Sequence, residues 1–132
     1  MEMEKRHRKF AGVPSAIKPF YVTHEDTDTD LLLIGITSTN GALEEAVEEL
    51  EAEGKKVNHL QLRLLSPFPT EALRPYIEGA KKVLIVEEDL TAQLRELFAI
   101  HFDCHDKLLS LLQYDGTPFT TSTIVNKAKE VF

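Results

Sequence analysis

The chain has 132 residues, a length at which a single hydrophobic core is expected. Its composition, 42% hydrophobic and 28% charged, excludes the disordered, collagenous and disulfide-rich classes of protein. The net charge of −7 opposes binding to nucleic-acid phosphates, so we expect no nucleic-acid partner. No apolar run approaches the roughly 20 residues that span a bilayer, so we expect a cytoplasmic protein without a membrane partner.

The first thirty residues have the composition of a linker. A basic cluster at 5–9 (KRHRK) is followed by prolines and then by an acidic-polar run at 25–30 (EDTDTD). Such a cluster can serve as a nucleic-acid-binding arm, but beside an acidic domain it is more typical of a solvated connection. We predict a linker over residues 1–30, with a short edge strand within 20–23, and one domain over 31–132.

Strands are predicted where apolar residues run without alternation. The segment 31–36 (LLLIGI) has the pattern of a strand that is covered on both faces. Similar runs predict strands over 57–62 and 82–86, and a fourth strand is expected within 108–114. Strands that are buried on both faces require helices above and below them.

Helices are predicted between these strands from the helical spacing of apolar residues. The first follows Gly41 and ends at Gly54, a residue suited to a left-handed cap. A short second helix contains Pro75, which should kink or shorten it. The third carries an apolar stripe made of Leu90, Leu94, Leu97, Phe98 and Phe102. The last helix starts at Thr120 or Thr121.

The alternation of strands and helices indicates an α/β fold. We predict three layers, α/β/α, around a mainly parallel sheet of four to five strands. In such sheets, ligands and partner groups meet the loops that leave the carboxyl ends of the strands. Here these loops are 37–41, 63–69 and 87–93.

The first of these loops, 37–41 (TSTNG), lies between a strand and a helix. Backbone amides and the positive end of the helix dipole can hold a phosphate at such a place, and the candidate cofactor-binding residues are Ser38, Thr39, Asn40 and Gly41. The loop lacks the lysine of a P-loop and the third glycine of a dinucleotide-binding motif. We therefore favour helix capping and a tight turn.

A second candidate is the cluster of His101, Cys104 and His105, whose helical offsets let the side chains converge on a metal ion. Asp103 or Asp106 is a possible further ligand. The spacing fits no standard zinc motif, so we favour a partly buried thiol beside surface histidines and predict no metal site. Cys104 is the single cysteine, which excludes an intramolecular disulfide and a four-thiolate iron–sulfur site.

A third candidate is the run of carboxylates Glu87, Glu88 and Asp89 after a predicted strand. Mutual repulsion can raise the pKa of one such group and suit it to acid–base chemistry. No nucleophile pattern accompanies them. We favour hydrogen bonding of Glu87 to amides of the neighbouring loop, with Asp89 or Thr91 capping the next helix.

Several segments occur in the order found in one known family. They are 37–41 (TSTNG), 65–69 (LSPFP), Glu87 with Gln93, and 114–119 (YDGTPF). In this order they resemble the alpha subunit of 2-oxoacid:ferredoxin oxidoreductases, in its carboxyl-terminal domain, which is similar to the last domain of transketolase. The resemblance covers roughly the whole chain.

The resemblance implies a role inside a larger enzyme. The family's enzymes use thiamine diphosphate and magnesium to decarboxylate a 2-oxoacid, pass electrons through iron–sulfur clusters to ferredoxin, and transfer the acyl group to coenzyme A as co-substrate. Thiamine diphosphate in that family lies between a preceding pyrimidine-binding domain and a diphosphate-binding beta subunit, and neither is in this chain. We therefore expect no catalytic residue, cofactor or metal in this domain, and an isolated chain without activity.

The expected contribution of the domain is contact with the other domains and subunits. We expect these contacts from the loop residues Arg63, Pro67, Phe68, Pro69, Glu87 and Gln93. The expected substrate is 2-oxoglutarate or a related 2-oxoacid, with pyruvate left open. Two alternatives are a free-standing small-molecule or nucleotide-binding module that uses 37–41, and the carboxyl-terminal domain of another thiamine-dependent enzyme such as transketolase or a 2-oxoacid dehydrogenase.

Overall fold

The computed structural model describes residues 19–36, 40–63, 68–87, 93–103, 105–112 and 120–131, and the statements below refer to this part of the chain. In chain order it forms β1 (Phe20–Val22), β2 (Thr29–Ile36), α2 (Asn40–Ala52), β3 (Val57–Leu62), α3 (Thr70–Gly79), β4 (Ala80–Glu87), α4 (Gln93–His101), the 3-10 turn η2 (His105–Lys107), β5 (Leu108–Leu112) and α5 (Thr121–Val131). The strands predicted from apolar runs are confirmed, and β2 and β4 extend beyond their predicted bounds.

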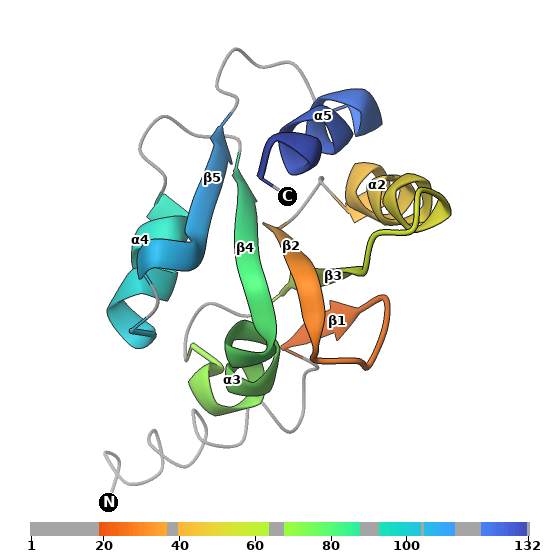
Figure 1. The fold of residues 1–132 in the computed structure, drawn as a ribbon. Coiled ribbons are helices and arrows are strands. Elements are labelled where there is room, and N and C mark those ends of the chain that lie inside the picture. Colours follow the sequence, from red (N-terminus) through yellow and green to blue (C-terminus); the bar gives the residue numbers. More distant parts are fainter. Residues whose placement is uncertain are drawn as a thin grey trace, which may run out of the picture.

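The strands form a five-stranded sheet in the order β1-β3-β2-β4-β5 (Figure 1). β3, β2, β4 and β5 run parallel, whereas β1 pairs antiparallel with β3 at one edge. The predicted mainly parallel sheet is therefore confirmed. β2 lies at the centre, and its residues 31–35 are all buried, which accounts for the apolar run without alternation.

Helices cover both faces of the sheet, α2 and α5 on one and α3 and α4 on the other (Figure 1). The core under α2 and α5 contains Leu31 and Leu33, while the core under α3 and α4 contains Leu32 and Ile34. Alternate residues of β2 thus point into opposite cores, as the period of a strand requires. The predicted three-layer α/β/α architecture is confirmed.

The helix ends follow the predicted capping chemistry at two places. Gly54 has a positive φ of 86° just after α2, and the amide of Lys55 donates to the carbonyl of Leu50 at 3.0 Å. At the start of α5, the Oγ1 atom of Thr120 accepts a hydrogen bond from the amide of Thr123 at 3.2 Å. Gly54 and Thr120 therefore cap the ends of α2 and α5, as the sequence predicts.

The second helix, α3, is short, as predicted, and contains Pro75. The helix continues past the proline to Gly79. Leu73 and Ile77, on either side of the proline, are both buried against the sheet, while Pro75 itself is exposed. Burial of these two side chains holds the helix together where the proline removes one backbone hydrogen bond.

None of the helices in the described ranges combines the length and the apolar character that crossing a membrane requires.

Candidate functional site

The structure places only part of the three loops that were predicted at the carboxyl ends of the strands. Ser38, Thr39 and Pro67 lie outside the described residues. Asn40 opens α2 and Gln93 opens α4, and their side chains are likewise outside the description. Gly41 is exposed in the first turn of α2. The remaining candidates, Arg63, Phe68, Pro69 and Glu87, are described with their contacts.

Glu87 ends β4 and is buried, with 3% of its surface exposed. Its Oε1 atom accepts a hydrogen bond from the amide of Leu94 at 2.5 Å, and its Oε2 atom accepts one from the amide of Arg95 at 3.1 Å. These amides belong to the first turn of α4, whose N–H groups have no partner within the helix. The carboxylate therefore joins β4 to α4. Glu87 forms hydrogen bonds, as predicted, but the described bonds are with amides of the helix and not with amides of the loop before it.

We expect the Glu87→Gln substitution to destabilise the domain by about 1–3 kcal/mol. The amide that replaces one oxygen is a donor, so it leaves one amide of α4 facing a second donor in a buried place. Urea denaturation of the variant and the parent chain measures the difference. Glu96→Gln, at an exposed position of the same helix, is the matched control and should change stability by less than about 0.5 kcal/mol.

Arg63 follows β3 and is exposed. Its Nη1 atom donates to the hydroxyl oxygen of Tyr21 at 2.6 Å, and its guanidinium lies over the Tyr21 ring, 5.1 Å from the ring centre. Its backbone amide donates to the carbonyl of Pro19 at 2.8 Å. Arg63 thus joins the end of β3 to β1, and its charge stays at the surface.

Polar side chains are buried along β3, a feature that the sequence analysis missed. Asn58, His59 and Gln61 are exposed by 0%, 2% and 7%. Asn58 binds the segment after β1: its Oδ1 accepts from the amide of His24 at 2.9 Å, and its Nδ2 donates to the carbonyls of His24 and Asp26 at 2.8 and 3.2 Å. One amide side chain therefore fixes the path between β1 and β2.

His59 lies on the face of the sheet that α2 covers, because it pairs in register with Leu33. Its Nε2 atom is 3.0 Å from Oε1 of Gln61, and its Nδ1 atom is 3.4 Å from Oγ1 of Thr23. A neutral ring that donates from Nε2 and accepts at Nδ1 satisfies both partners. Burial lowers the pKa of His59 below its ordinary value of 6.5, and the hydrogen bond to Gln61 and the charge of Glu44 offset this lowering only in part.

We expect His59 to make the stability of the domain depend on pH. The folded state binds a proton at His59 less readily than the unfolded state, whose pKa is near 6.5. Stability is therefore full above pH 6.5 and falls as the pH decreases from there through the lowered pKa of the folded state. Urea denaturation between pH 5 and 8 measures this, and the His59→Gln variant should show a flatter profile. An unchanged profile in that variant would contradict the assignment.

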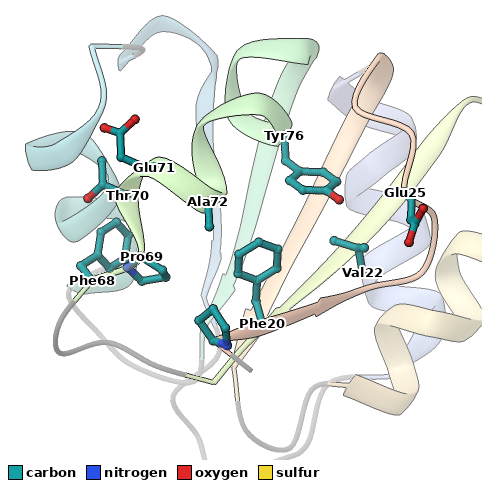
Figure 2. A pocket seen from close by; sticks show the side chains of 10 residues that line it. Phe20, Val22, Glu25, Phe68, Pro69, Thr70, Glu71, Ala72 and Tyr76 are labelled. Carbon is teal, nitrogen blue, oxygen red and sulfur yellow. The ribbon is translucent and has the colours of Figure 1, made fainter. Parts of the chain in front are cut away.

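An apolar groove lies on the opposite face of the sheet, between β1 and the start of α3 (Figure 2). Its volume is about 670 Å³, and it is lined by Pro19, Phe20, Val22, Glu25, Phe68, Pro69, Thr70, Glu71, Ala72 and Tyr76. Phe20 and Tyr76 meet edge to face with ring centres 5.8 Å apart. Two predicted contact residues, Phe68 and Pro69, therefore line a surface hollow.

Phe68 also contacts side chains of α4. Its ring centre is 5.2 Å from that of Phe98 and 4.4 Å from that of His101, whose ring stacks on it. The hydroxyl of Thr70 is 3.2 Å from Nδ1 of His101. His101 is thus engaged with α3 and Phe68. Of the other members of the metal hypothesis, Cys104 and the side chain of His105 lie outside the description.

In the described part of the chain, no group of three or more His, Cys, Asp or Glu side chains is placed to hold a metal ion.

The comparisons with known proteins agree with this fold. A split-gene transketolase superposes on 84% of this chain with a TM-score of 0.68 at 18% identity, covering 41% of that chain. This likeness shows the fold: the domain is a three-layer α/β domain of the transketolase carboxyl-terminal type. A family model described as pyruvate:ferredoxin oxidoreductase core domain II matches residues 29–116. The chain belongs to this family.

Individual relatives are subunits of oxidoreductases. The alpha subunit of 2-oxoacid:ferredoxin oxidoreductase 2 from Aeropyrum pernix is 31% identical over 131 residues, which is 98% of this chain and 20% of that subunit. The structure of 2-oxoglutarate:ferredoxin oxidoreductase from Magnetococcus marinus, with 2-oxoglutarate, coenzyme A and succinyl-CoA bound, matches 98% of this chain and 22% of that chain, with a TM-score of 0.88 and 30% identity. The chain spans about a fifth of the length of these relatives.

Proposed function

We propose that this chain functions as core domain II in the alpha subunit of a 2-oxoacid:ferredoxin oxidoreductase. The observation that carries the proposal is the match to the Magnetococcus marinus enzyme, which extends over 98% of this chain with a TM-score of 0.88. Residues 1–30 then connect the domain to the rest of the subunit, and the last part of this segment supplies β1. The assembly is cytoplasmic in this proposal.

The domain's role in the proposal is contact and support. Two of the proposed contact residues, Phe68 and Arg63, have surfaces that a neighbouring domain or subunit can reach, in the groove and at the end of β3. Glu87 is buried within the chain and contributes by holding α4 in place. Thiamine diphosphate, magnesium and iron–sulfur clusters then belong to other parts of the assembly, which include the beta subunit. Ferredoxin accepts the electrons, and coenzyme A accepts the acyl group.

The proposed substrate is 2-oxoglutarate. Support comes from the structural relative that matches nearly the whole chain and whose structure contains 2-oxoglutarate and succinyl-CoA. Pyruvate is the competing substrate, since the family model bears its name. A substrate preference is set by residues that contact the 2-oxoacid, so it can be tested only in the assembled enzyme.

Co-expression of this chain with chains that supply the pyrimidine-binding, thiamine-diphosphate-binding and ferredoxin-like domains tests the proposal. We expect the chains to co-elute in size-exclusion chromatography. The complex should reduce ferredoxin when 2-oxoglutarate and coenzyme A are present, and more slowly with pyruvate. The isolated chain and the partner chains without it are the controls, and both should be inactive. Failure to co-elute with folded partners, or tight nucleotide binding by the isolated chain, would contradict the proposal.

A further inference from the structure

The segment 19–26, which enters the domain ahead of β2, is held along β3 at two places. At one of them the buried side chain of Asn58 binds the backbone of His24 and Asp26 with three hydrogen bonds. At the other place the segment is held by Arg63. Asn58 lies near the start of β3 and Arg63 directly follows its end, and β1 pairs antiparallel with β3, so the two contacts lie at opposite ends of β1.

Arg63 makes three contacts with the start of β1. Its backbone amide donates to the carbonyl of Pro19 at 2.8 Å, and its Nη1 atom donates to the hydroxyl oxygen of Tyr21 at 2.6 Å. Its guanidinium also lies over the Tyr21 ring, 5.1 Å from the ring centre. Both side chains are exposed, and contacts at the surface are individually weak because water competes for both groups.

The remaining contacts of β1, at the edge of the sheet, leave it less firmly held than its neighbour (Figure 1). None of its three residues is fully buried, whereas all six residues of β3 are. Phe20 packs edge to face on Tyr76 of α3, and both rings stay partly exposed. Segments with few buried contacts open at a lower free energy than the core of a sheet. Opening at Asn58, in contrast, breaks three hydrogen bonds of a buried side chain, so the end that Arg63 holds opens first.

We propose that Arg63 and Tyr21 form a latch on the start of β1, and that its opening releases residues 19–22 while Asn58 keeps the following residues in place. The flexible part of the connection then gains four residues, whose extended length is at most about 14 Å. The latch thus sets how far the domain can move from the segment before it without unfolding of its sheet. The inference rests on the proposed function in that this segment is taken as the connection to the rest of the subunit.

Amide hydrogen exchange of the full chain, labelled with nitrogen-15 and followed by NMR, tests the latch. Backbone amides at three places are compared: Arg63 at the latch, Thr23 just after β1, and Leu33 in the buried central strand. After correction for intrinsic rates, we expect the amide of Arg63 to exchange at least about tenfold faster than the other two. Equal protection at the three places would mean that β1 opens only with the whole sheet, and the proposal would be overturned.

The Arg63→Met variant keeps an unbranched apolar side chain and removes both side-chain contacts with Tyr21. Exchange of the amide at position 63 should become about five- to twentyfold faster, while exchange at Thr23 should change by less than about twofold. Arg74→Met is the matched control, because Arg74 also lies over an aromatic ring, that of Phe102 at 5.6 Å, but belongs to α3. Equal effects of the two variants at position 63 would contradict the latch.

Tyr21→Phe tests whether the hydroxyl of Tyr21 acts through Arg63. The change keeps the ring, and it should speed exchange at position 63 about two- to fivefold in the parent chain. In the Arg63→Met background the same change should have a smaller effect, because the two side chains act as one unit. Fully additive effects would show that they act independently, and the latch would be wrong.

Two outcomes separate this inference from the proposed function. If the chain co-elutes with its partner chains but exchange at position 63 does not respond to Arg63→Met, the latch is wrong while the proposed function stands. If exchange responds as expected but the chain never co-elutes with folded partners, the proposed function fails, and with it the claim that the latch controls a connection within a larger subunit.

Discussion

Replacing Gly79 with alanine is expected to destabilise the domain by about 3 kcal/mol. A Cβ atom at Gly79 would lie 2.0 Å from the carbonyl oxygen of Thr27 and 2.7 Å from its carbonyl carbon. These are backbone atoms of the segment that leads into β2, so neither side can move away without shifting α3 or that segment. The gain of roughly 1 kcal/mol that alanine brings in a helix is too small to offset the overlap.

Gly41→Ala is the matched control for this prediction. Gly41 lies in the first turn of α2, and a Cβ atom there meets no described atom within 4 Å. We expect this variant to be as stable as the parent chain, or more stable by up to about 1 kcal/mol. Thermal and urea denaturation of both variants decide the matter. A Gly79→Ala variant that matches the parent would show that Thr27 does not approach α3 as closely as described.

The second large effect is expected for Phe98→Ala, a loss of about 3–5 kcal/mol. Phe98 is completely buried in the core under α3 and α4. Its ring contacts those of Phe68 and Phe102, with ring centres 5.2 and 5.9 Å away. Truncation removes these apolar contacts and leaves a cavity in the core under α3 and α4.

Ile100→Ala tests whether this loss is due to burial rather than to a change in α4. Ile100 lies on the same helix but is 77% exposed, so its truncation should change the free energy of unfolding by less than about 0.5 kcal/mol. The Phe98→Ala variant should also alter the groove, because Phe68 loses its edge-to-face neighbour. A comparable loss in the two variants would contradict the prediction that burial of Phe98 in the core determines the outcome, because alanine has a higher helix propensity than either residue.

The sheet could be predicted because its central strands are buried on both faces. The run at 31–36 is apolar at every position, and it is too short for a typical helix, so a strand is the better prediction. The helix caps at Gly54 and Thr120 could also be predicted, because each cap depends on one residue type and its nearest neighbours in the sequence. Local sequence patterns were therefore enough to predict most of the fold.

The polar network of β3 and the groove could not be predicted in this way. Asn58 and His59 form hydrogen bonds with residues 34 and 36 positions earlier in the chain. No local sequence pattern reveals such partners. Phe20 and Tyr76, which form facing walls of the groove, are likewise brought together only by the sheet order. The burial of Leu73 and Ile77 on either side of Pro75 likewise depends on the sheet against which α3 packs.

The position of β1 outside β3 has a consequence for the order of folding. β1 precedes β2 in the chain, but its partner residues in β3, such as Leu60 and Leu62, come only after β2 and α2. When the chain emerges from a ribosome, this strand is made first and must wait for a partner that is made later. The pairing of β1 therefore becomes possible only after β3 has been made, although it spans less of the chain (Phe20 to Leu62) than the central pairing of β2 with β4 (Thr29 to Ala80).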